Sequence, residues 1–142
     1  MALYKKIYFV SQDNMDGKIL TPRVPKNFLT DNGYEDATTK RVCFSSSING
    51  CLIALSQNLE GKEFYVHTPV DMNSLKIVKP SKSQVPDVVH TKELWVTNPV
   101  KIRAFCKIIV GKAKDKPLMY KYGDNKIAYL YAWEYTRKEL TD

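Results

Sequence analysis

The predicted fold is decided by Arg41-Val-Cys-Phe-Ser45-Ser-Ser-Ile-Asn-Gly-Cys51-Leu-Ile-Ala-Leu55. Residues 41–44 form a short run with β-branched and aromatic side chains, which is typical of a strand entering a core. The serines that follow are good caps for the start of a helix. Four apolar residues then recur at the spacing of one helix face: Ile48, Cys51, Leu52 and Leu55. The stretch therefore predicts a buried strand, a serine corner and an amphipathic helix.

The serine corner has two interpretations. Hydroxyls and free backbone N–H groups at the start of a helix can bind an anion such as a phosphate. The same hydroxyls can instead cap the helix by accepting hydrogen bonds from its first turn. On the corner alone, capping is the favoured interpretation.

Around this unit the chain of 142 residues reads as a single domain, 1–142, that is rich in strands. Residues 100–110 alternate apolar and polar side chains, as a half-buried antiparallel strand does. Gly123-Asp-Asn125 marks a hairpin turn. The predicted strands are Leu3–Val10, Glu63–His67, Leu75–Val78, Lys92–Thr97, Val100–Val110, Leu118–Tyr122 and Lys126–Tyr135. The predicted class is α+β with one clear helix.

Two features point to a cytoplasmic protein without a membrane span. No apolar run approaches the ~18 residues that a span needs. The first ten residues lack the pattern of a secretory signal.

The cysteines Cys43, Cys51 and Cys106 are odd in number and are predicted to be buried thiols. No metal site is expected, because His67 and His90 have no spaced partner ligands.

The formal net charge of +7 is concentrated near the end of the chain, where residues 101–142 hold ten basic and five acidic side chains. This surplus suits an anionic partner, whether a nucleotide, an acidic protein or a nucleic acid, although a solvated basic face is an equal alternative. Aromatic and apolar residues of one parity accompany it: Ile127, Tyr129, Tyr131, Trp133 and Tyr135. Such a ladder can stack nucleic-acid bases, but a core or subunit contact is the favoured interpretation.

A scattered set of polar residues could carry a ligand site: Ser11, Arg23, Glu35, Arg41, Ser45, Ser47 and Glu93. Glu93 stands at the start of a predicted strand, where a carboxylate can orient a ribose hydroxyl or act as a general base. An exposed acid beside Lys92 is the alternative. Glu35 lies in an irregular excursion, residues 27–40, that could close over a ligand or be a surface loop.

Three segments follow one another in the chain: Ile7-Tyr8-Phe9-Val10-Ser11, Arg41-Val-Cys-Phe-Ser45 with its helix, and Glu93-Leu-Trp-Val. In this order they resemble segments of the ADP-ribosyltransferase fold. The resemblance covers roughly residues 4 to 100, and segments such as Pro22-Arg23-Val-Pro25 also look like parts of small bacterial and phage proteins. It implies a split antiparallel β-sandwich that binds NAD in a cleft.

The resemblance also implies roles for single residues. Glu93 would polarise the ribose, Ser45 and Ser47 would line the nicotinamide pocket, and Arg23 and Arg41 would hold the pyrophosphate. The implied function is transfer of ADP-ribose from NAD to a macromolecule.

One residue departs from this pattern. Phe9 stands where the family has a histidine, and a phenyl ring cannot hydrogen-bond a ribose. Either an arginine supplies that contact, or the protein is a non-catalytic binder. A phage or bacterial protein of the second kind would sequester a nucleotide signal or block a host defence protein.

Overall fold

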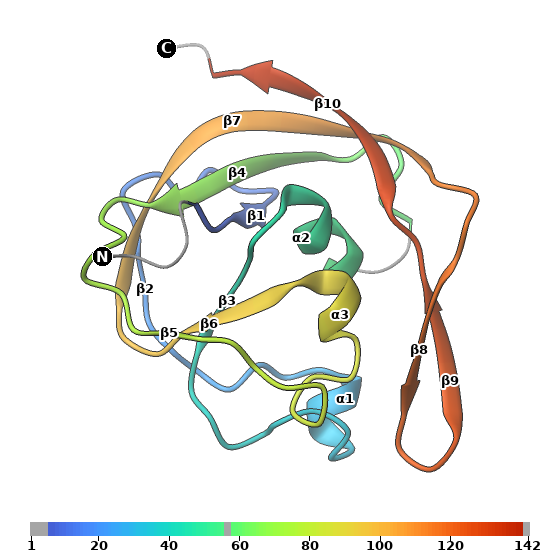
Figure 1. Ribbon diagram of the computed structural model, residues 1–142. Helices are drawn as coiled ribbons and strands as arrows, with labels where there is room; N and C mark the ends of the chain where they lie inside the picture. Colours follow the sequence, from blue (N-terminus) through green and yellow to red (C-terminus); the bar gives the residue numbers. More distant parts are fainter. Residues whose placement is uncertain (1–5, 56–57, 141–142) are drawn as a thin grey trace.

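The computed structural model describes residues 6–55 and 58–140, which form two main antiparallel sheets with few helices (Figure 1). The larger sheet has the order β1-β4-β7-β10, and β2 pairs with the first part of β7. Its strands are β1 (Phe9–Ser11), β2 (Ile19–Leu20), β4 (Glu63–Pro69), β7 (Val100–Ala113) and β10 (Trp133–Glu139). This architecture confirms the predicted α+β class.

The second sheet has the order β3-β6-β5 and includes the strand of the Arg41–Leu55 stretch. Its strands are β3 (Val42–Ser45), β5 (Ile77–Val78) and β6 (Glu93–Val96). The helices are α1 (Phe28–Asp31), α2 (Ile48–Leu55) and α3 (Val88–Thr91). An isolated bridge between Tyr8 and Ser45 joins the two sheets just before β1 begins. The predicted strand, serine corner and helix are therefore confirmed as β3 and α2. The predicted apolar face of the helix is wrong at Leu55, which is 44% exposed, whereas Ile53 is buried.

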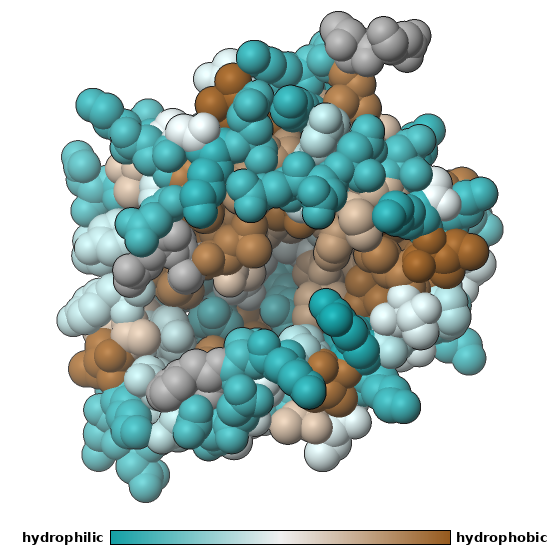
Figure 2. All heavy atoms as spheres, turned by 180° about the vertical axis from the view of Figure 1, so that it is seen from behind, coloured by the Kyte–Doolittle hydropathy of each residue, from teal (hydrophilic) through white to brown (hydrophobic). Residues whose placement is uncertain are grey.

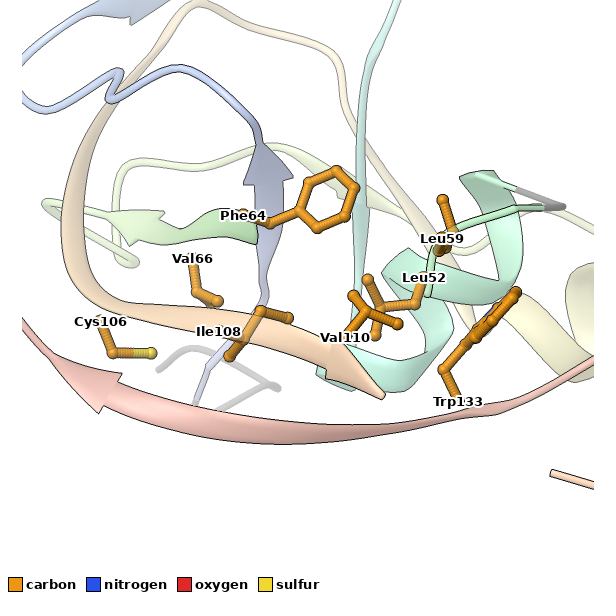
Figure 3. Close-up of a cluster of buried hydrophobic side chains, with 8 residues drawn as sticks. All are labelled: Leu52, Leu59, Phe64, Val66, Cys106, Ile108, Val110 and Trp133. Carbon is orange, nitrogen blue, oxygen red and sulfur yellow. The ribbon is translucent and has the colours of Figure 1, made fainter. Parts of the chain in front are cut away.

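Strand β7 holds the molecule together because its two halves pack into different cores. Val100 and Ile102, in the first half, pack with β3 and β6 in one apolar cluster. Cys106, Ile108 and Val110, in the second half, pack with α2, β4 and Trp133 in another, shown in Figure 3. The alternation read from the sequence is thus real, and β7 extends three residues beyond the predicted end.

The ends of the chain differ from the sequence prediction. The first strand was predicted as residues 3–10, but β1 spans only Phe9–Ser11, and residues 1–5 lie outside the described chain. The last strand was predicted as residues 126–135. It divides into β9 (Lys126–Leu130), which pairs with β8 (Leu118–Tyr122), and β10, which leaves the hairpin to pair with β7. The burial of Trp133, at 6% exposed, anchors this change of partner.

The hairpin of β8 and β9 stands beside the two sheets (Figure 1). Within the described residues, no helix is both long and apolar enough to cross a membrane. The excursion at residues 27–40 was expected to be irregular, and it contains only the single turn of α1.

Candidate functional site

Three hollows share Cys43 in their linings and are here called together the Cys43 cleft. The inner cavity, of about 200 Å³, lies between β1, β3, α2 and the start of β6. The acidic cavity, of about 470 Å³, adjoins it and is walled by the β8–β9 hairpin. The arginine cavity, of about 490 Å³, lies beside β2 and holds Arg23. Cys43 lines all three. A hollow near the centre of one face of the molecule, with hydrophobic side chains along its upper edge, is visible in Figure 2.

Glu93 lies where the inner and acidic cavities meet. Lys92 adopts a left-handed conformation, with φ of 54°, and so turns the chain from α3 into β6 with Glu93 as the first strand residue. The indole N–H of Trp95 donates a hydrogen bond to Glu93 Oε2 at 2.6 Å. Burial raises the pKa of Glu93 to about 7, against the effect of the Trp95 hydrogen bond. The carboxyl can therefore give or take a proton near neutral pH.

The cavity around Glu93 brings together three positions that the family resemblance singled out. Phe9 of β1, Ser45 of β3 and Glu93 of β6 all line the inner cavity. Ser45 and Glu93 are direct partners across the antiparallel β3–β6 pair, so their neighbourhood follows from strand register. Phe9 reaches the same place because the Tyr8–Ser45 bridge sets β1 against the end of β3.

The serine corner caps the helix. Ser47 Oγ accepts a hydrogen bond from the Gly50 N–H at 2.9 Å, as an N-cap does. Ser45 Oγ accepts from the Ser47 N–H at 3.2 Å and donates to the Thr91 carbonyl at 2.6 Å. These amide donors are therefore engaged within the protein, which favours capping over the phosphate site.

Gly50 explains why α2 can approach this corner so closely. A Cβ at this position would collide with the Thr91 carbonyl oxygen and with Ser45 Oγ. The absence of a side chain therefore brings α2, β3 and the end of α3 together behind the inner cavity. Ser45 belongs to the wall of the cavity through this packing, and Ser47 does not line the Cys43 cleft.

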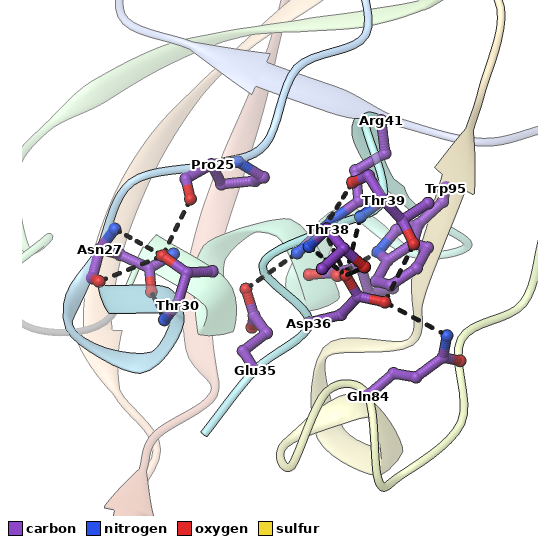
Figure 4. A network of polar contacts seen from close by, with 11 residues as sticks. Pro25, Asn27, Thr30, Glu35, Asp36, Thr38, Thr39, Arg41, Gln84 and Trp95 are labelled. Carbon is purple, nitrogen blue, oxygen red and sulfur yellow. Dashed lines mark hydrogen bonds and ion pairs between the residues drawn. The ribbon is translucent and has the colours of Figure 1, made fainter. Parts of the chain in front are cut away.

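Arg41 also lines the arginine cavity, but it is only 1% exposed and its guanidinium is held in a buried network (Figure 4). Its guanidinium lies 4.1 Å from the centre of the Trp95 ring. Nη2 is 3.2 Å from Glu35 Oε2, and Nη1 is 3.7 Å from Asp36 Oδ1. Nη1 also donates to the Thr39 carbonyl at 2.8 Å. The expected pyrophosphate contact would break these buried interactions, so the geometry favours a structural role for Arg41.

Arg23 has the opposite environment. Its backbone pairs with that of Arg41 through two hydrogen bonds of 3.0 Å, while its side chain is exposed and lines the arginine cavity. Within the described residues, the Arg23 side chain has no hydrogen bond or ion pair. It is the arginine of the predicted pair that can meet an anionic ligand.

Of the two remaining predicted residues, Glu35 lines the cleft and Ser11 does not. Glu35 lines the acidic cavity, where burial raises its pKa although Arg41 opposes this shift. Ser11 lies outside the Cys43 cleft, and its Oγ accepts the Asp13 N–H at 3.1 Å in the turn after β1. Five of the seven predicted residues therefore line the cleft, namely Arg23, Glu35, Arg41, Ser45 and Glu93. Ser11 and Ser47 do not, and Arg41 and Ser47 serve the fold.

The acidic cavity contains residues that the sequence reasoning missed. Asp87, before α3, lines it together with Glu35 and Glu93, and burial raises the pKa of Asp87. Tyr120 and Tyr122 of the hairpin form an opposite wall. Among the described residues that line this cavity there is no lysine or arginine. The alternation of the hairpin could have identified the two tyrosines as one face, whereas nothing local marks Asp87.

Two reactive residue types near the cleft are poor catalysts. Burial, followed by the nearby charge of Glu93, raises the pKa of Cys43 to about 12, which keeps the thiol protonated. His67 is fully buried, its Nε2 accepts the Met15 N–H at 2.9 Å, and burial lowers its pKa. Glu93 is therefore the strongest candidate for proton transfer in the cleft.

Comparison of the chain with models of protein families, with curated proteins and with solved structures found no match.

Proposed function

We propose that the chain binds NAD or a closely related nucleotide in the Cys43 cleft and transfers ADP-ribose to a macromolecule. The observation that carries this proposal is the meeting of Phe9, Ser45 and Glu93 on the inner cavity. These are the positions that the resemblance to the ADP-ribosyltransferase fold assigns to the nicotinamide end of NAD.

Glu93 would act on the ribose next to nicotinamide. Transfer would break the bond between the ribose C1′ and the pyridinium nitrogen, and the electron pair of that bond would leave with neutral nicotinamide. Positive charge then develops on the ribose, and a nearby carboxylate stabilises it. Because burial raises the pKa of Glu93 to about 7, the carboxyl can carry that negative charge near neutral pH. A nucleophilic atom of the macromolecule would form the new bond to C1′ and would lose its proton to the Glu93 carboxylate. Phe9 would pack its ring against nicotinamide instead of hydrogen-bonding the ribose.

The distribution of charge in the cleft favours one orientation of the ligand. The acidic cavity, with Glu35, Asp87 and Glu93, disfavours a diphosphate group. The arginine cavity offers the exposed guanidinium of Arg23, which binds phosphate oxygens in bidentate fashion. The diphosphate is therefore assigned to the arginine cavity and nicotinamide to the inner cavity. Arg23 alone takes the role that the sequence gave to two arginines.

The decisive experiment measures binding and cleavage separately. We expect NAD to raise the melting temperature of the wild-type protein, and we expect nicotinamide release to be detectable by chromatography. Glu93→Gln should lower the release rate about 100-fold or more while it retains the thermal shift. Arg23→Met should reduce the thermal shift. The matched control is Glu60→Gln, which removes an exposed carboxylate outside the cleft and should change neither measurement.

Phe9 favours a second candidate, a non-catalytic binding protein. Its ring offers the inner cavity an apolar surface where a hydrogen-bonding histidine would aid cleavage. Such a protein would sequester a nucleotide signal or block a host defence protein. A thermal shift with NAD, ADP-ribose or a cyclic nucleotide, without nicotinamide release, would select this candidate. The absence of both shift and release would refute the enzyme and the nucleotide-sequestering protein alike.

A further inference from the structure

The β8–β9 hairpin has two faces with different surroundings. Its inner face, with Tyr120 and Tyr122, walls the acidic cavity. On its outer face, register pairs Met119 with Tyr129 and Lys121 with Ile127. Cross-strand partners lie on the same side of a sheet, so these four side chains form one surface, here called the hairpin face.

The hairpin face is apolar and exposed. Met119 and Ile127 are each 49% exposed, and Tyr129 is 55% exposed. Tyr131, just beyond β9, adds a further partly exposed ring. A contiguous group of such residues, as opposed to single scattered ones, marks an interaction site on a soluble protein.

The hairpin is fixed to the body, so this exposure does not come from a detached arm. The Tyr122 and Tyr34 rings meet edge to face at 5.0 Å between centroids. Lys126 Nζ donates to the Tyr34 hydroxyl at 2.6 Å, and His90 Nε2 lies 2.8 Å from the Met119 carbonyl oxygen. These contacts use the inner face and the backbone and leave the outer face free for a partner.

The charges around the hairpin identify the chemistry of that partner. Five lysines lie between residues 112 and 126, against two acidic residues, Asp115 and Asp124. All five are exposed: Lys112, Lys114, Lys116, Lys121 and Lys126. Register places Lys121 on the hairpin face itself, whereas Lys126 contacts Tyr34 on the inner side, and the other three lysines precede β8 in the sequence. An apolar surface that carries and adjoins positive charge complements a partner segment in which acidic residues accompany apolar ones.

The composition of the face favours a protein over a nucleic acid. Single-stranded nucleic acids bind to successive aromatic rings on which the bases stack. Here two of the four side chains, Met119 and Ile127, are aliphatic, and methionine and tyrosine are enriched in protein interfaces. Both outer edges of this two-stranded sheet also lack a strand partner within the described chain, so an extended segment can lie alongside.

We infer that the hairpin face is a docking surface for an acidic, extended segment of a partner protein. Met119, Ile127 and Tyr129 form its apolar centre, and Lys121 with the neighbouring lysines supplies the charge. This inference is independent of the proposed activity, because none of these residues lines the Cys43 cleft.

The test uses the full chain and a fluorescent twelve-residue peptide of alternating glutamate and apolar residues. We expect fluorescence anisotropy to show saturable binding that weakens with salt, and we expect the same peptide with lysine in place of glutamate not to bind. The double variant Met119→Ser with Tyr129→Ser should weaken binding about tenfold or more. Lys121→Glu should weaken it about fivefold.

Matched controls lie outside the hairpin face. Val70→Ser removes an apolar residue that is 53% exposed, and Lys79→Glu reverses an exposed charge near β5. Both should bind as the wild type does. Melting temperatures of all variants separate lost binding from lost folding.

Three results would overturn the inference. The first is no saturable binding of the acidic peptide, or binding that the hairpin variants leave unchanged. The second is tighter binding of a twelve-residue oligothymidylate, which would assign the face to a nucleic acid. The third is concentration-dependent self-association of the protein that the hairpin variants abolish, which would assign the face to a second copy of the chain.

Discussion

Replacing Glu93 by glutamine should change how the stability of the protein depends on pH. Burial raises the pKa of this carboxyl from an ordinary value of 4.5 to about 7. The folded protein therefore holds the Glu93 proton more tightly than the unfolded chain does. The stability associated with this group is fully present below about pH 4.5 and is lost as the pH rises through 7.

The size of the effect follows from the pKa difference. One pKa unit corresponds to 1.36 kcal/mol, so the ionisation of Glu93 lowers the free energy of unfolding by about 3 kcal/mol above pH 7. Glutamine cannot ionise, but its side-chain oxygen can still accept the Trp95 hydrogen bond. We therefore expect the stability of Glu93→Gln, relative to wild type, to increase by about 3 kcal/mol between pH 4.5 and 8.

Urea unfolding of both proteins at several pH values measures this difference. The carboxyls of Glu35 and Asp87 also have raised pKa values, but they are present in both proteins and largely cancel in the comparison. Glu60→Gln is the control for the loss of one carboxylate. A difference between Glu93→Gln and wild type that stays constant from pH 4.5 to 8 would refute the burial argument, and with it the basis for proton transfer by Glu93.

Two further substitutions test the fold around the cleft. Arg41→Met should lower the free energy of unfolding by about 3–5 kcal/mol, because Glu35 then lies in a buried site without its cationic partner. Arg23→Met is the control and should change the free energy of unfolding little. Urea unfolding of the two variants measures the difference. Gly50→Ala should destabilise the protein by about 1–3 kcal/mol, since the added methyl group meets the backbone at Thr91, and an unfolding midpoint equal to that of wild type would contradict this packing.

Local patterns in the sequence were sufficient where one strand or helix carries its own signal. β3, α2 and β6 were placed by apolar periodicity and by the serine caps, and the register of β3 against β6 then brings Ser45 beside Glu93. The cleft residues on these elements could therefore be predicted.

The roles of the other candidates depend on contacts between distant segments. Arg41 reads as a charged residue at the start of a strand, and only the approach of Trp95, 54 positions later, buries its guanidinium. Asp87 has no motif of its own and joins Glu35 and Glu93 only through the tertiary fold. A single sequence contains no signal for such convergence, because neither periodicity nor capping reports it.

The buried network gives the excursion at residues 27–40 a role that differs from closing over a ligand. Glu35 and Asp36 hold the Arg41 guanidinium, which lies over the Trp95 ring. The indole N–H of Trp95 in turn donates a hydrogen bond to Glu93. The excursion is thereby connected to Glu93 through two side chains. Burial is the main cause of the raised pKa of Glu93, and the two charges of the ion pair make smaller contributions of opposite sign, since Glu35 raises the pKa and Arg41 lowers it. Because the pair is held in place, the proton affinity of Glu93 is set by the fold before any ligand arrives.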